Sequence, residues 1–90
     1  MTLVNIGYNN MVSCEHIIAV IGSDTAPAKR LLGEAKESGR IIDATCGKKT
    51  QAVIVTDSDH VILSAIQAET VANRLDNNDS SIDDEEEEND

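Results

Sequence analysis

Short apolar runs separated by turn residues follow one another along most of the chain. Residues 3–6 predict a first strand, which Gly7 ends and the Asn9–Asn10 turn signal follows. A second extended region is predicted over residues 11–13 and 16–21, and its sequence IIAVI is apolar on both faces. Because such a run is typical of a strand covered on both sides, we expect both faces of this strand to be covered.

A helix is predicted next, because apolar residues then recur at a spacing of three or four. Ser23, Asp24 and Thr25 are residue types that cap helix N-termini, and Pro27 suits a first turn, where its missing N–H is no loss. Gly39 is placed to end this helix in a left-handed conformation. The apolar face of the helix consists of Ala28, Leu31, Leu32 and Ala35.

The next two apolar segments, residues 40–44 and 51–56, predict strands that pair with each other as a hairpin. Their connection, residues 45–50, contains Gly47, which is available for a positive φ. The hairpin would place the adjacent lysines Lys48 and Lys49 at its tip.

The last part of the pattern predicts a turn at residues 57–59, a strand at 60–65 and a short helix at 69–75, capped near Gln67 or Ala68. The predicted order is therefore two strands, a helix, three strands and a helix, with short turns between the strands. This order predicts an α+β fold with a small, mostly antiparallel sheet, one main helix and a short C-terminal helix.

Charge divides the chain into two parts. Residues 76–90 contain nine acids and no base, so we expect residues 77–90 to form a disordered acidic tail and residues 1–76 to form one domain. The formal charge of −10 therefore misdescribes the domain, since residues 1–75 carry eight acids and seven bases. Residues 29–49 carry six of those bases and only three acids, which gives the domain one basic segment.

Composition limits the core and the class of protein. Tyr8 is the only aromatic residue, and a domain this small buries only roughly 60% of its unfolded surface, so oligomerisation is favoured. The longest apolar stretch, residues 17–21, is too short to span a membrane. The N-terminus lacks the basic residues of a secretory signal, and two cysteines fit a reducing compartment. We therefore expect a cytoplasmic protein.

Two basic features are candidate contacts for phosphate. Lys48 and Lys49 follow Gly47, which lets a partner approach the backbone, although a solvated turn that keeps the protein soluble also explains them. Lys29 and Arg30 lie in the first turns of the predicted helix, where bases oppose the helix dipole. A phosphate-facing helix N-terminus would explain their placement, and so would an ordinary exposed helical face.

Catalytic and metal-binding patterns are weak. Residues 57–60 (DSDH) contain the residue types of a hydrolytic triad, but contiguous residues in an extended turn are expected to point apart. The spacing of Cys14, His16, Cys46 and His60 matches no zinc pattern, and both cysteines are expected to be buried as small apolar residues. We therefore expect no enzyme activity, no cofactor and no metal site.

Several strings are specific enough to compare with known families. They are NIGY at residues 5–8, APxKR at 26–30, IDATxGKKT at 42–50, DSDHVILSA at 57–65 and ETVAxRL at 69–75. Together they resemble the RemA family, small bacterial regulators of extracellular-matrix (biofilm) genes. The resemblance runs over residues 2–75 and leaves the acidic tail outside.

This resemblance implies a function and an assembly. It implies a DNA-binding transcriptional regulator that is not an enzyme, with a fold likened to the LytTR type of DNA-binding domain. The subunits would form a closed, octameric ring that binds DNA along its outer surface. Family DNA contacts are attributed to two adjacent arginines after the loop glycine, here Lys48 and Lys49, and to an arginine early in the second strand, here His16.

These departures leave two functions open. Lysine keeps the charge but not the bidentate guanidinium contact, and His16 is expected to be mostly neutral near pH 7. The alternative to DNA binding is therefore a structural or protein-interaction ring with little DNA affinity. The acidic tail would either compete with DNA phosphate for the basic loop or only keep a ring soluble. The DNA-binding candidates are Lys48, Lys49, His16, Lys29 and Arg30.

Overall fold

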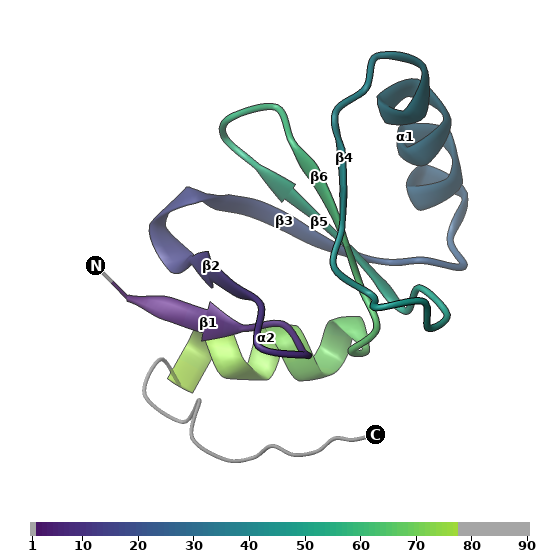
Figure 1. The fold of residues 1–90 in the computed structure, drawn as a ribbon. Helices are drawn as coiled ribbons and strands as arrows, with labels where there is room; N and C mark the ends of the chain where they lie inside the picture. Colours follow the sequence, from purple (N-terminus) through teal and green to yellow (C-terminus); the bar gives the residue numbers. More distant parts are fainter. Residues whose placement is uncertain (1, 78–90) are drawn as a thin grey trace.

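The fold is taken from a computed structural model in which residues 2–77 are described. The predicted acidic tail lies outside these residues, except that Asn77 is the last residue of a helix. The prediction of an α+β fold is confirmed (Figure 1). In chain order the elements are β1 (Leu3–Asn5), β2 (Met11–Ser13), the 3-10 helix η1 (Cys14–His16), β3 (Ile17–Gly22), α1 (Ala26–Glu37), β4 (Ile41–Asp43), β5 (Ala52–Thr56), β6 (Val61–Ser64) and α2 (Ala68–Asn77).

Four strands form the main sheet in the order β3-β5-β6-β4, and β1 pairs with β2 in a separate two-stranded sheet. Every pairing is antiparallel except that of β4 with β6, which confirms a mostly antiparallel arrangement within residues 2–77. In Figure 1, α1 lies on one side of the main sheet, and α2 lies with β1 and β2 on the other. Each face of the main sheet therefore has its own apolar core.

The predicted hairpin around Gly47 is wrong. β6 lies between β4 and β5, so these two strands are not neighbours. Their connection crosses the end of β6 instead, since the Ala44 N–H donates to the Leu63 carbonyl at 2.9 Å and the Gln51 N–H donates to the Ser64 carbonyl at 2.8 Å. Three of the four residues of β6 are buried and none of β4 is, so burial favours β6 in the centre and β4 at the edge.

The second extended region is divided between two sheets. Its first part, β2, pairs with β1, and η1 then leads the chain into β3. The expectation that this region is covered on both sides is also wrong, because no residue of β3 is buried. β3 is in addition an edge strand. Ile18 is 66% exposed, at a β-bulge between Ile17 and Ala19. An apolar run does not specify which neighbour covers each face, so the edge position was not predictable from it.

The signals predicted for the ends of α1 are confirmed. Thr25 is the N-cap, and its Oγ1 accepts a hydrogen bond from the Ala28 N–H at 3.3 Å. Pro27 lies in the first turn, and Gly39 follows the helix with a φ of 69°. These signals act through hydrogen bonds and backbone preferences close in sequence, which is why the sequence alone places the helix.

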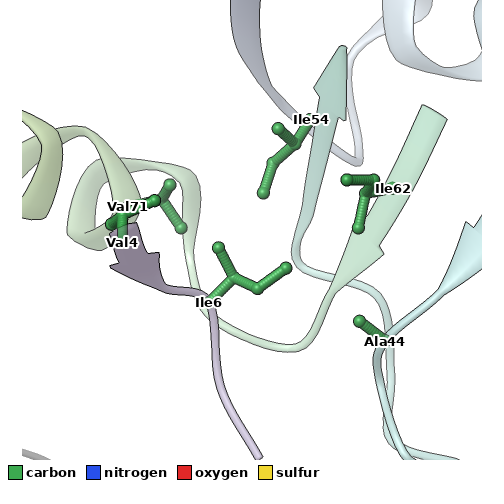
Figure 2. Packing of buried hydrophobic residues seen from close by; sticks show 6 residues of the cluster. All are labelled: Val4, Ile6, Ala44, Ile54, Ile62 and Val71. Atoms are coloured by element: carbon green, nitrogen blue, oxygen red, sulfur yellow. The ribbon is translucent and has the colours of Figure 1, made fainter. Parts of the chain in front are cut away.

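The larger core fills the space between the main sheet, α2, and the β1–β2 sheet. Figure 2 shows its buried residues, which are Val4, Ile6, Ala44, Ile54, Ile62 and Val71. Ile6 and Ile54 are among the largest fully buried side chains, so small aliphatic groups do the packing that aromatic residues do in other domains.

Ile54→Ala should destabilise the domain, because Ile54 is fully buried at the middle of β5. The expected loss in free energy of unfolding is about 2–5 kcal/mol, against about 0.5–1.5 kcal/mol for the control Ile54→Val. Urea unfolding of both variants and the parent protein, at one protein concentration, measures the losses. Equal losses for the two variants would contradict the burial of Ile54.

Candidate nucleic-acid interface

The loop that carries the two lysines contains a tight turn. The Lys48 N–H donates to the Thr45 carbonyl at 3.0 Å, and the two residues between them have positive φ values, 54° for Cys46 and 82° for Gly47. Turns with two left-handed central residues favour glycine at the second of them. The predicted positive φ of Gly47 is thus confirmed, and the turn leaves Lys48 and Lys49 exposed.

Both ends of this loop are tied to the fold. At its start, the Asp43 carboxylate accepts hydrogen bonds from the Thr45 hydroxyl at 2.6 Å and the Thr45 N–H at 2.9 Å. Both bonds stabilise the ionised carboxylate and so lower the pKa of Asp43, and the bond from the hydroxyl contributes more than the bond from the N–H. At its end, the Ser23 Oγ donates to the Thr50 carbonyl at 2.8 Å. Only residues 46–49 are left exposed between these two anchors.

The second anchor brings the loop to the beginning of α1. Ser23 lies two residues before the N-cap Thr25, so the loop and the first turns of the helix share one end of the main sheet. Both segments lie at the same side of the molecule in Figure 1. The structure therefore gathers two features that lie apart in the sequence, and together they form a surface that we call the basic end: Lys29, Arg30, Lys48 and Lys49.

The charge of the basic end is not compensated within residues 2–77. The described part of the chain has one ion pair, between His16 and Asp57, and no lysine or arginine nitrogen lies within 4.0 Å of a carboxylate. All four side chains of the basic end belong to exposed residues. An exposed surface of this kind can take up phosphate groups without first breaking an internal pair.

His16 does not belong to the basic end. It lies in η1, next to the first residue of β3, Ile17, which pairs with Thr56. The loop approaches the other end of β3, where Gly22 pairs with Ala52. A strand of this length spans roughly 17–20 Å. The five predicted contacts therefore do not form one patch in a single subunit.

The side chain of His16 is already paired with Asp57. Its Nδ1 lies 3.0 Å and 3.2 Å from the two carboxylate oxygens of Asp57, and the two side chains are 62% and 51% exposed. The hydrogen bond to Asp57, and then the charge of Asp57, raise the pKa of His16 above its ordinary value. The expectation of a mostly neutral His16 did not take this partner into account. The Asp57 carboxylate favours the protonated imidazolium form, and its own negative charge offsets the positive charge of that form.

The DSDH segment closes the β5–β6 hairpin. Contrary to the expectation that its side chains point apart, the Ser58 Oγ lies 2.8 Å from the His60 Nδ1. Thr56 joins the same network, since its Oγ1 lies 2.9 Å from the Ser58 Oγ and accepts from the His60 N–H at 3.3 Å. The carboxylate of Asp57 turns to His16 instead of His60, so the three triad residue types do not form a relay.

The cysteines differ from the expectation of two buried thiols. Cys14 is half-buried in η1, and Cys46 is exposed in the tight turn, at the other end of the main sheet. The expectation failed for Cys46 because the turn projects from the fold, where no element covers it.

Residues 2–77 hold neither a metal-binding cluster nor a membrane span. No three His, Cys, Asp or Glu side chains of this part of the chain gather around a common point. Neither of its helices is long and apolar enough to cross a bilayer.

The sequence analysis missed the roles of three residues: Asp43 and Ser23, which anchor the lysine loop, and Asp57, which pairs with His16. Asp43 carried a local signal that was missed, because an aspartate two residues before a threonine often closes a turn with its backbone. Ser23 and Asp57 had no such signal for their roles, since their partners lie 27 and 41 residues away.

The fold and the basic end together define a small α+β protein with an uncompensated cationic surface. The RemA-like family, described as extracellular matrix regulatory protein A-like, matches residues 3–75. The chain therefore belongs to this family, which confirms the resemblance seen in its sequence strings.

Individual relatives agree with this assignment. A protein of Geobacillus thermodenitrificans is 59% identical over 75 residues, which cover 83% of this chain and 86% of the relative. A protein of Acetivibrio thermocellus is 52% identical over 90 residues, or 97% of each chain, and one of Geobacillus sp. strain WCH70 is 60% identical over 72 residues, or 80% and 83%. All three carry the provisional name of regulatory protein.

Asp57→Asn should lower the pKa of His16, because it removes the carboxylate that stabilises the imidazolium. Since the folded-state pKa of His16 is raised, the pair stabilises the fold fully below about pH 6.5, the ordinary histidine value, and this contribution is lost as pH rises through the folded pKa. An NMR titration of His16 measures the shift in its pKa, and thermal unfolding at low and high pH measures the linked stability.

The matched control is Asp59→Asn, which removes a carboxylate from the same turn that is not a hydrogen-bond partner of His16. It should leave the His16 titration nearly unchanged. An unchanged midpoint in Asp57→Asn would show that the ion pair does not form in solution.

Proposed function

We propose that this protein is a DNA-binding transcriptional regulator of the extracellular-matrix type, which contacts DNA phosphates through its basic end as a homo-oligomeric ring. The observation that carries the proposal is the positive charge of the basic end, which forms no ion pair within residues 2–77, on a domain whose total charge is close to neutral. Membership of the RemA-like family supports it, since the family is described as regulatory. The LytTR-type fold and a cytoplasmic location stay predictions.

The geometry of the loop suits contact with a phosphate backbone. Gly47 has open space around the position of a Cβ atom, so a phosphate could approach the turn closely. Lysine is a point charge on a flexible stem, without the planar fork by which arginine recognises guanine. Contacts of this kind position a protein on DNA and carry little sequence information. We therefore expect binding that tolerates many sequences.

Exposed apolar residues support the ring. The outer edges of β3 and β4 have no strand partner within residues 2–77, and each carries a large exposed residue, Ile18 at 66% and Ile42 at 46%. A core built from small aliphatic side chains gives one subunit little stability to spare. Association through these edges would bury the apolar residues and repeat the basic end around the assembly.

One observation favours the alternative, a structural or protein-interaction ring with little DNA affinity. His16, at the position of a family arginine, is held by Asp57 at 3.0 Å and so carries no free charge. If phosphate binding needs this position, the basic end by itself would be too weak.

Lys48→Ala/Lys49→Ala should weaken binding to duplex DNA. The salt dependence should also flatten, by about 0.9 units of the log–log slope for each DNA phosphate that the variant no longer neutralises. Lys48→Arg/Lys49→Arg should bind at least as tightly as the parent, because guanidinium groups also pair with phosphate. Fluorescence anisotropy at several salt concentrations measures affinity and slope.

The matched control for the single variant Lys48→Ala is Lys36→Ala, which removes one charge from the far end of α1. It should reduce affinity much less. Equal effects of the two single variants would remove the basic end as the binding surface, and absence of binding by the parent protein at low salt would favour the alternative function.

The purified protein should be an oligomer, and Ile18→Asp should shift it toward smaller species because a buried charge at an association edge is costly. Sedimentation equilibrium measures both masses. A monomeric parent protein at micromolar concentration would contradict the ring.

A further inference from the structure

The basic end is positive even when its neighbouring acids are counted. Three acids lie in or beside the segments that form it: Asp24 just before α1, Glu34 one helical turn after Arg30, and Asp43 at the start of the loop. The two hydrogen bonds from Thr45 stabilise the ionised carboxylate of Asp43 and leave its negative charge in place. None of these three carboxylates forms an ion pair within residues 2–77, so four cations share this surface with three carboxylates and its net charge stays positive.

The same chain carries a complementary segment. Residues 78–90 contain eight acids and no base. They continue from α2, which ends at Asn77. Thirteen residues can reach about 45 Å when extended, while the longest dimension of the domain is 35 Å. The segment is thus long enough to reach the basic end of its own subunit.

Tethering makes such a contact effective although each charge pair is weak. In Figure 1, α2 ends on the opposite side of the molecule from the β4–β5 loop, so the segment itself has to bridge that span. Its effective concentration at the basic end is highest when its r.m.s. length matches the span. Its carboxylates would meet the same lysine and arginine nitrogens that a DNA phosphate would use, so the two ligands exclude each other. Both interactions are ionic, and salt weakens both.

We infer that the acidic segment at residues 78–90 binds the basic end and competes with DNA for it. This inference rests on the proposed function, because it assigns a regulation to the same surface. The segment thereby selects for polyanions. DNA binds because many adjacent phosphates together displace the carboxylates, whereas an isolated anion does not displace them. The apparent DNA affinity of the full chain is therefore lower than that of the basic end alone, most of all at low salt.

A full-length variant in which the eight acids of residues 78–90 are replaced by Asn or Gln tests the competition with DNA. Its affinity for a 30-base-pair duplex, a length chosen to span about three helical turns, is compared with the parent by fluorescence anisotropy. The variant should bind about 3- to 30-fold more tightly at 50 mM salt, and the ratio should approach one at 300 mM, as screening removes the internal contact. A ratio of one at both salt concentrations overturns the inference.

Carbodiimide crosslinking of the full-length parent protein tests the contact without DNA. The reagent joins a Lys Nζ to a carboxylate only where the two touch, and mass spectrometry identifies the linked peptides. Residues 78–90 should be linked to Lys29, Lys48 and Lys49 several-fold more than to Lys36, the control at the far end of α1, and 300 mM salt should abolish the preference. Equal linkage to all four lysines, or to none, overturns the inference.

The two readouts separate the inference from the function on which it rests. If neither the parent nor the neutralised variant binds DNA at 50 mM salt, the proposed function fails. The crosslinks then still show whether the acidic segment occupies the basic end.

Discussion

The β5–β6 pair, almost entirely buried between two layers, is the constraint on which the rest of the structure depends. Because β6 stands between β5 and β4, the chain must cross the end of β6 on its way from β4 to β5. Backbone bonds to Leu63 and Ser64 hold this crossing in place. The loop with Lys48 and Lys49 is thereby brought to the end of the sheet where α1 begins. The position of the basic charge is thus a consequence of strand order.

The two ends of the main sheet differ in how their charges are treated. At one end, Asp57 pairs with His16, so no unpaired positive charge stands there. At the other, four cations stand together without an ion pair inside residues 2–77. Like charges that share a surface destabilise a fold slightly, so stability does not explain the basic end. The proposed recognition of a polyanion, either DNA or the acidic segment of the same chain, would explain it.

Weak contacts of this kind need repetition to produce useful affinity. A single subunit offers a few exposed lysine and arginine groups and a core of small aliphatic side chains. The exposed residues Ile18 and Ile42, on the two open edges of the sheet, are where further subunits could add both buried area and further basic ends. Assembly would then serve stability and binding through the same contacts.

The sequence by itself determined the features that depend on near neighbours. The α+β class, the Thr25 cap, the left-handed Gly39 and Gly47, and the family all followed from local patterns or strings. Only the tertiary structure decided which strands are neighbours and what His16 binds. Strand order depends on how several segments share one buried sheet, and the partner of His16 lies 41 residues away. Hydrogen bonding and burial between such distant segments produce no recognisable pattern in the sequence of either segment. The Lys48–Lys49 loop could therefore be found in the sequence, but its place beside α1 could not.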